Sequence, residues 1–535
     1  MTSKKFHLQI LLLWVLLVVI GLNGRSYVPI DETRYVTVAW NMWLNSDYLV
    51  PYLNGIAYSH KPPLLFWLIN LGWKIFGVND WWPRFVPSLF ALASVFITRK
   101  IAGRLWPGQA IIKDNASLIL ISSGLWVVFS TTLMFDMLIA FFTVLGVWGM
   151  LIAAQDRGIK GWLLLALAIG GGLLAKGPTI LLQLLPLALL AHWWNADNKP
   201  NAKNWYLPLF CSVLGGAAIA LIWAIPAGIR GGSEYAHAIF WGQTADRMVH
   251  SFAHDRPYWW YVPLMPLLLF PWLLWGTFWQ GLFSQNLIRQ EAGVRLCFAW
   301  AIPVFVGFSL ISGKQIHYIL PIFPAFALLI ARCIENSQTI LRKHLLPIFI
   351  VMMVIGIIFL GLPYYASTNP SHSAFWLQSL PPWLGLLTVL LGLALYLSPE
   401  QSAPRTVSKI SLFSIIFVTV AQFIILRTAG DAYDVRPISA KIKILESQHI
   451  PVAHSGKYPG IYNFIGRLEQ SPTSLEANEI EPWFVAHPNG RLIEYFHNKE
   501  ELGSLPAEYA QAFKGDFVAI MTHEQWLVKK ASQTK

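Results

Sequence analysis

Long uncharged apolar runs recur along this chain from Leu8 to Leu426, and they limit what it can fold into. A helix needs about 20 mostly apolar residues to cross a bilayer. Only 12% of the 535 residues are charged and 55% are hydrophobic, whereas a soluble chain has roughly a quarter of its residues charged. The sequence therefore predicts an all-α polytopic membrane protein. Its 26 tryptophans fit this class, because indole rings favour the membrane–water boundary.

The runs predict about thirteen spanning helices followed by a soluble tail. The predicted spans are 8–23, 84–99, 115–131, 136–154, 161–176, 178–194, 206–226, 259–279, 295–312, 317–333, 345–362, 381–398 and 409–427. We therefore expect a transmembrane domain over 1–427 and a small α/β domain over 428–535. In the tail, the pattern predicts strands at 450–453, 483–486 and 517–521, and helices near 436–448 and 507–514.

The basic residues predict the orientation, because Lys and Arg in short loops face the cytoplasm. The N-terminus has a basic flank and an apolar core but no convincing cleavage site, so we interpret it as an uncleaved first helix with Lys4 and Lys5 inside. The basic loops after every second span then also lie inside. Thirteen crossings leave the tail outside, which predicts a bacterial inner-membrane protein with a cytoplasmic N-terminus and a periplasmic C-terminal domain.

The net charge of +12 is spread over these loops and forms no patch, so we expect no nucleic-acid partner. Cys211, Cys297 and Cys333 lie in or beside apolar runs, which argues against a disulfide framework and shows no metal-type spacing. The outer segment 24–83 is too long for a simple loop. Within it, residues 31–46 and 64–76 read as interfacial helices, since the second is too short to span.

Several cations on the predicted outer face violate the orientation rule. They are Arg34, Lys61, Arg84, Arg230, Arg247, Arg256 and Lys314. Binding of an anion explains such placement, and contact with lipid headgroups is the alternative. Lys61 is the most informative of them, because Pro62 and Pro63 hold it in a stiff turn that suits a phosphate, beside Tyr58 and His60. A lysine that only snorkels to the interface is the competing interpretation.

Carboxylates accompany these cations. Asp31 and Glu32 directly follow the first span, where they either act in catalysis or cap a helix. Asp136 and Lys176 lie at the outer ends of two predicted spans, where helix capping alone would also explain them. His60 is the candidate metal ligand, and a hydrogen-bonded structural histidine is the alternative. Together, acids and cations from distant segments predict a site for a phosphorylated, membrane-embedded substrate.

These motifs resemble the GT-C glycosyltransferases that use polyprenyl-phosphate sugars, a group that includes the protein O-mannosyltransferases and the lipid A aminoarabinose transferases. The resemblance rests on DETRY, LVPYLNG, KPPLLFW, WWPRF, LMFDM, LLAKGP, IFWGQTADRM and GKQIHYILPIFP, which together cover residues 25–325. It implies that Asp31 is the catalytic carboxylate, with Glu32 beside it. It also implies that Lys61, Arg247 and Tyr318 hold the lipid phosphate, and that Asp136 and Lys176 line the cavity. Tyr58 and Lys314 complete the predicted substrate-binding set.

The chain departs from the aminoarabinose enzymes at their metal site. In those enzymes a glutamate precedes the lysine and a histidine lies about three residues before the arginine, whereas this chain has His60 and Thr244. The resemblance therefore carries over neither a metal nor an aminoarabinose donor with certainty, and a divalent metal is left open.

The sequence predicts an inverting glycosyltransferase that moves a sugar from undecaprenyl phosphate to an envelope acceptor, such as lipid A, another glycan or a protein. Membrane lipids surround it. A membrane transporter or lipid flippase is the alternative from another class, although transporters place ionisable residues near the bilayer midplane.

Overall fold

The computed structural model describes residues 3–23, 25–196, 201–242, 255–284, 291–335, 341–369, 374–399, 402–497, 501–502 and 507–533. Within these ranges, nine helices are long and apolar enough to cross a membrane, or ten if one bent pair is a single span. The nine are α1 (Ser3–Asn23), α4 (Trp82–Leu105), α7 (Asp136–Asp156), α8 (Ile159–Lys176), α11 (Ala202–Gly231), α17 (Ala292–Leu310), η4 (Ile316–Ile322) continuing into α18 (Phe323–Glu335), α19 (Leu346–Thr368) and α21 (Ala403–Thr428). The chain is a multi-pass membrane protein.

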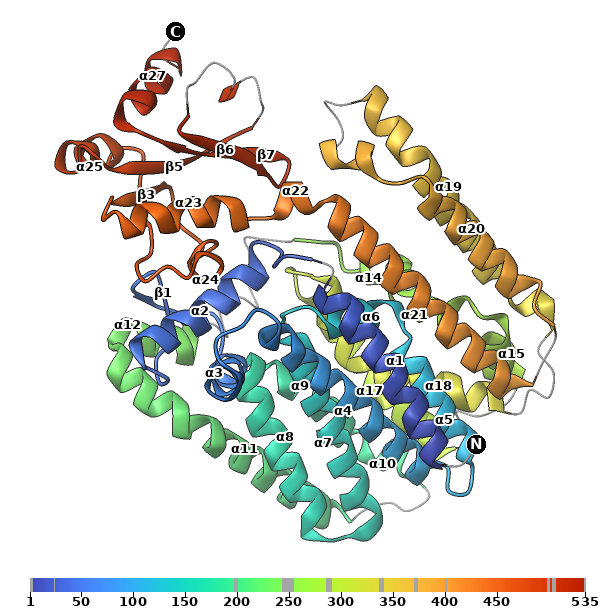
Figure 1. Cartoon of the computed structure of the whole chain (residues 1–535). Helices are drawn as coiled ribbons and strands as arrows, with labels where there is room; N and C mark the ends of the chain where they lie inside the picture. The colour runs from blue at the N-terminus through green and yellow to red at the C-terminus, as the bar shows by residue number, and fades with distance from the viewer. Residues whose placement is uncertain are drawn as a thin grey trace.

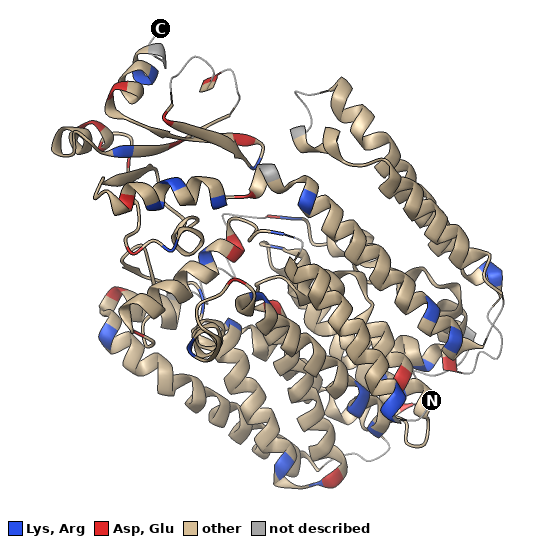
Figure 2. Ribbon diagram, in the orientation of Figure 1, with Lys and Arg blue, Asp and Glu red and all other residues tan. Residues whose placement is uncertain are grey.

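The helices form a bundle whose charged residues gather at its two ends, with long uncharged stretches between them (Figures 1 and 2). One end carries α2, α3 and the C-terminal sheet, and we call it the outer end. At the other end, Arg104 pairs with Asp156 at 2.9 Å and joins α4 to the end of α7.

Ten of the thirteen predicted spans coincide with these helices, counting the bent pair of α5 (Ala110–Ile121) and α6 (Gly124–Ser130), whose axes differ by 63°. The exact count of thirteen is not confirmed. Segment 178–194 forms the short helices α9 (Thr179–Leu189) and α10 (Ala191–Trp194), and segment 381–398 forms the 14-residue α20 (Trp383–Tyr396).

The predicted span 259–279 is not one helix. It is divided into α14 (Tyr261–Leu268), the 3-10 turn η3 (Trp272–Leu274) and α15 (Gly276–Ser284). Pro266 lies inside α14 and Pro271 precedes η3. Proline has no N–H to donate and its ring clashes with the preceding turn, so an apolar run that satisfies the hydropathy rule does not continue as a helix.

The outer segment forms the two predicted helices. α2 spans Asp31–Asn45 and α3 spans Leu64–Phe76, with a two-stranded hairpin of β1 (Tyr52–Leu53) and β2 (Ile56–Ala57) between them. Both helices follow their sequence signals, since Pro63 precedes α3 and Gly77 ends it at a φ of +73°. They lie across the outer end of the bundle (Figure 1).

The tail after α21 is a small α/β unit. Its five-stranded sheet has the order β4-β3-β5-β7-β6, parallel at β4-β3-β5 and antiparallel at β5-β7-β6. Its elements are α22 (Gly430–Tyr433), α23 (Arg436–Ser447), β3 (Val452–Ser455), α24 (Asn463–Gly466), β4 (Thr473–Leu475), α25 (Ile480–Ala486), β5 (Arg491–Phe496), β6 (Tyr509–Phe513), β7 (Asp516–Met521) and α27 (His523–Gln533).

Two predictions for the tail are wrong. The predicted strand 483–486 belongs to helix α25, which buries Ile480, Trp483 and Phe484 on one face at helical spacing. The predicted helix 507–514 is strand β6, because the left-handed turn at Lys514 and Gly515 folds it back onto β7. The strand near 450, the strand near 517 and the helix near 436 are confirmed as β3, β7 and α23.

Candidate functional site

The outer ends of three spanning segments bring one acid and two basic side chains together. Asp136 is the first residue of α7 and is 1% exposed. Lys176, the last residue of α8, donates from Nζ to Asp136 Oδ1 at 2.5 Å. His317 in η4 places Nε2 3.9 Å from Asp136 Oδ2. Gly177, at a φ of +71°, ends α8 directly after the lysine and so holds Lys176 at the rim.

An aromatic cluster around Phe135 joins this acid to the outer segment. Tyr35 of α2 packs edge-on against Phe135 with 4.9 Å between ring centroids, and Phe66 of α3 does so at 5.5 Å. Lys61 lies with Nζ 5.8 Å from the centre of the same ring. Because Phe135 precedes Asp136, the predicted phosphate lysine and the buried acid lie on one wall. Tyr58 is buried beside them, and its ring lies 5.2 Å from that of His60, with the two planes tilted by 34°.

Lys176 also faces Tyr318, with Nζ 4.6 Å from the ring centroid. The structure therefore brings together Tyr58, Lys61, Asp136, Lys176 and Tyr318, all predicted from the sequence. They come from the outer segment, α7, α8 and η4, which are far apart along the chain. Their roles toward a substrate stay predictions.

Asp31 lies on the exposed side of the same region. It is the first residue of α2, and its side chain is 50% exposed and pairs with Arg34 at 2.5 Å. The N-cap residue of α2 is Ile30 and no side chain caps the helix, so the capping interpretation of Asp31 finds no support in the geometry. Burial raises the pKa of neighbouring Tyr35 well above its ordinary value, helped by the negative charge of Asp31.

Glu32 occupies a different environment from Asp31. Its buried carboxylate pairs with Arg25 and also accepts backbone N–H groups from Val28 at 2.9 Å and from Leu133 at 2.7 Å. Burial favours the neutral acid, but Arg25 outweighs burial and holds the pKa of Glu32 below its ordinary value. These contacts tie the start of α2 to the turn before α7, and the predicted catalytic role of Glu32 stays a prediction.

Lys314 likewise has protein partners. Its Nζ donates to the carbonyl oxygens of Arg256 at 2.8 Å and Ile311 at 2.5 Å, and the residue is 3% exposed. Lys314 therefore fixes the segment around Arg256 to the turn before η4. The sequence could not distinguish this role from phosphate binding, because both need a lysine at an outer helix edge.

Two predicted positions lie outside the described residues, namely Arg247 and the departing Thr244. Among the residues described, no three His, Cys, Asp or Glu side chains come together as a metal site would require. The ring of His60 lies against that of Tyr58, with the two planes tilted by 34°. A divalent metal at His60 stays a prediction, and no step below uses one.

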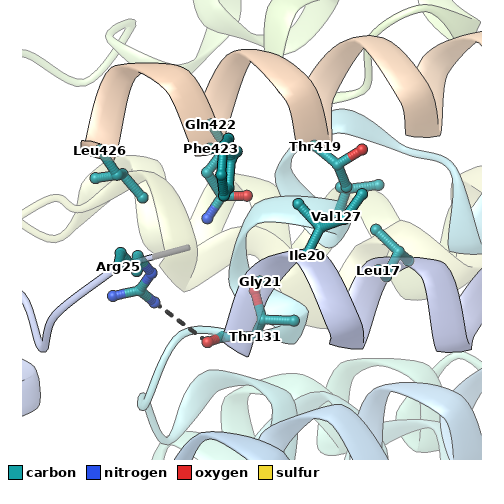
Figure 3. A pocket seen from close by; sticks show the side chains of 10 residues that line it. All are labelled: Leu17, Ile20, Gly21, Arg25, Val127, Thr131, Thr419, Gln422, Phe423 and Leu426. Atoms are coloured by element: carbon teal, nitrogen blue, oxygen red, sulfur yellow. Dashed lines mark hydrogen bonds between the residues drawn. The ribbon is translucent and has the colours of Figure 1, made fainter. Parts of the chain in front are cut away.

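A small pocket beside Arg25 is shown in Figure 3. It lies between α1, α6 and α21 and is mainly apolar, with Leu17, Ile20, Val127, Phe423 and Leu426 in its lining. Arg25 at its edge donates to Thr131 O at 3.2 Å, the contact dashed in Figure 3. Since the same guanidinium also pairs with Glu32, we do not assign this pocket to a phosphate.

Comparisons with known proteins agree with this geometry. Residues 60–228 match the family model described as dolichyl-phosphate-mannose-protein mannosyltransferase. The undecaprenyl phosphate-alpha-4-amino-4-deoxy-L-arabinose arabinosyl transferase of Pectobacterium atrosepticum is 29% identical over 349 residues, covering 63% of this chain and 61% of that protein. The corresponding enzyme of Edwardsiella ictaluri is 30% identical, covering 61% and 58%. The match thus spans about three fifths of the length of these relatives.

The fold comparison extends over nearly the whole chain. The crystal structure of ArnT from Cupriavidus metallidurans bound to undecaprenyl phosphate superposes with a TM-score of 0.77 at 18% identity, covering 97% of this chain and 98% of that one. The chain therefore has the GT-C fold of that structure. The GT-C likeness therefore includes the small C-terminal sheet as well as the spanning helices.

His317 belongs to the site around Asp136, but the sequence analysis did not single it out. It is buried between Phe129, at 5.2 Å, and the edge of Tyr318, at 4.9 Å. The orientation rule counts only Lys and Arg, so it does not select a histidine. Its position next to the predicted Tyr318 was the one available clue.

Proposed function

We propose that this chain is an inverting glycosyltransferase that moves a sugar from undecaprenyl phosphate to an envelope acceptor. The observation that carries the proposal is the shared wall of Lys61, Asp136 and Lys176 beside Asp31, built by segments far apart in sequence. It is supported by the fold likeness to a protein bound to undecaprenyl phosphate and by relatives named as arabinosyl transferases that use this lipid. Lipid A, another glycan or a protein is the acceptor class.

The proposed step is a single displacement. An acceptor oxygen forms a bond to the anomeric carbon while the bond from that carbon to the phosphate oxygen breaks on the opposite face. Asp31 accepts the acceptor's proton, because half of its side chain is exposed and Arg34 holds it in position. The leaving lipid phosphate gains charge, which the cationic Lys61 stabilises together with Arg247 and the phenol of Tyr318.

We also propose that the protein lies in the bacterial inner membrane with its N-terminus in the cytoplasm and its tail in the periplasm. The distribution of loop charges supports this orientation. The acceptor and the lipid-linked sugar then meet at the outer end, where the donor's lipid stays in the bilayer.

A transporter or flippase is the competing function. Transporters place ionisable residues near the bilayer midplane, in broken helices. Here Asp136 begins α7 and Lys176 ends α8, so this buried pair lies at a membrane edge. That placement favours the enzyme.

The direct test of function is mass spectrometry of envelope lipids, glycans and proteins from cells with and without the gene. We expect one product to lose a single sugar in the deletion strain and to regain it with the restored gene. An unchanged envelope, together with transbilayer movement of lipid by the purified protein, would favour the flippase instead.

The donor site is tested by binding of undecaprenyl phosphate to the purified protein. A charge-assisted hydrogen bond contributes about 1.5–3 kcal/mol, so Lys61→Ala should weaken binding roughly ten- to a hundredfold. Lys74→Ala is the matched control, because Lys74 is an exposed lysine in the last turn of α3. Wild-type affinity of Lys61→Ala for undecaprenyl phosphate would show that Lys61 does not bind the phosphate.

A further inference from the structure

His317 and Asp136 place two polar atoms close together without a direct hydrogen bond. His317 Nε2 and Asp136 Oδ2 are 3.9 Å apart, which is too long for a direct hydrogen bond. A single hydroxyl or water can lie within hydrogen-bonding distance of two groups at this separation. Asp136 Oδ1 already accepts from Lys176, so Oδ2 is the oxygen nearer to His317.

The His317 ring is held in place for such a contact. Phe129 lies against it at 5.2 Å, tilted by 41°, and Tyr318 packs edge-on at 4.9 Å. The residue is 8% exposed. Packing alone would be served by any flat ring, but a ring with nitrogens next to a buried carboxylate also provides a polar atom at a fixed point.

The charges around His317 Nε2 and Asp136 Oδ2 favour an uncharged ligand group. Among the described residues of this wall and its outer rim, the carboxylates are Asp31, Glu32 and Asp136, and each is paired with a cation: Arg34, Arg25 and Lys176 respectively. Lys61 adds a further positive charge on the same side. Among these described residues a cationic amino sugar would therefore find no uncompensated carboxylate, whereas a sugar hydroxyl can both donate and accept.

We infer that His317 is a specificity-determining residue that, with Asp136, binds a hydroxyl of an uncharged donor sugar. This inference rests on the proposed function, because it places the sugar beside the lipid phosphate held at Lys61. His317 contributes to the recognition of the sugar and not of the phosphate. Its removal should lower the affinity added by the sugar and leave the affinity for the lipid phosphate unchanged.

The test compares binding of undecaprenyl phosphate with binding of the same lipid carrying glucose, galactose, mannose or 4-amino-4-deoxy-arabinose. We expect at least one hexose to bind the wild-type protein more tightly than both the bare lipid phosphate and the amino sugar. His317→Phe keeps a ring between Phe129 and Tyr318 but removes the nitrogens. It should lower the hexose-specific gain about five- to tenfold, with less than about a twofold change for the bare lipid phosphate.

His317→Gln is the second variant, since its amide can still hydrogen-bond; it should keep more of the hexose gain than His317→Phe does. His192→Phe is the control, because His192 contacts Tyr206 in a part of the bundle away from the site. A hexose gain that is unchanged in His317→Phe, or an amino sugar that binds the wild type more tightly than every hexose, would overturn the inference. Failure of the bare lipid phosphate to bind would instead refute the proposed function itself.

Discussion

Asp31 and Glu32 are neighbours in the chain, but their surroundings differ. The side chain of Asp31 is half exposed, and one of its carboxylate oxygens forms an ion pair with Arg34. The carboxylate of Glu32 is buried, pairs with Arg25 and accepts hydrogen bonds from two backbone N–H groups. A buried ion pair adds little net stability, but removing one partner leaves an uncompensated buried charge. Glu32 is therefore needed for the position of the helix that carries Asp31.

Glu32→Gln should lower the free energy of unfolding by about 3–5 kcal/mol, because it leaves Arg25 buried without a counter-charge. The measurement is thermal unfolding in detergent, with Glu469→Gln as the exposed control. Since the pKa of Glu32 is lowered by folding, its contribution is present above its unfolded pKa of about 4.3 and is lost as the pH falls through its folded pKa. Equal stability of wild type and Glu32→Gln at neutral pH would contradict this account.

At the scale of residues, the sequence could single out charges by their position. Lys61 was identified because it is a cation on the side where cations are disfavoured, and Lys176 because it lies at the outer end of a predicted span. The same rule selected Lys314, whose partners are carbonyl oxygens that have no sequence signature. The charge rule did not select His317, which is recognised as part of the site only from the 3.9 Å distance between its Nε2 and Asp136 Oδ2.

At the scale of elements, the short helix α24 connects the tail to the outer segment. Its Phe464 stacks on Trp73 of α3, with centroids 5.0 Å apart and planes 11° apart, and contacts Trp40 of α2 at 6.0 Å. Trp40 Nε1 also donates to Leu468 O at 2.8 Å. Figure 1 shows α24 beside α2 at this junction. Phe464 thus packs into the core of the membrane domain, although it belongs to the tail.

Phe464→Ala should cost about 3–5 kcal/mol of stability, because it leaves a cavity among buried aromatic rings. We expect a lower unfolding temperature and faster proteolysis of the tail in detergent. Val485→Ala, which truncates an exposed apolar residue of the same domain, should change little. If both variants melt like the wild type, the tail does not depend on this contact.

Elements were predictable where local signals agreed. Pro62 and Pro63 fix the start of α3, and the apolar run ends at Gly77. Residues 509–513 are strand despite their helix-forming Ala and Gln, since pairing with β7 across a tight turn outweighs local propensity. Such non-local pairing has no signature within the segment itself.

For the molecule as a whole, the apolar runs predicted a polytopic helical membrane protein and the motif resemblance implied the GT-C fold, while hydropathy could not show where a run is interrupted. Three predicted spans, 178–194, 259–279 and 381–398, do not form single helices long enough to cross a membrane. In 259–279, Pro266 and Pro271 explain the interruption. Orientation stays a prediction that rests on the loop charges.

That orientation can be tested by single cysteines in a background with Cys211, Cys297 and Cys333 replaced by serine. Gln470→Cys, exposed in the tail, should react with an impermeant maleimide in cells opened only at the outer membrane. Lys160→Cys, exposed in the first turn of α8, should react only after inner-membrane lysis. The reverse labelling pattern would show that the orientation in the membrane is opposite to the predicted one.

Transfer of sugar from a synthetic undecaprenyl-phosphate sugar to the acceptor found by mass spectrometry tests the central claim most directly. Asn cannot accept a proton near neutral pH, and general-base help contributes about 10²–10⁴-fold in rate. Asp31→Asn should therefore lose at least about a hundredfold in turnover while keeping wild-type melting and donor binding. Turnover near the wild-type rate in Asp31→Asn would contradict Asp31 as the base and direct the search to Asp136.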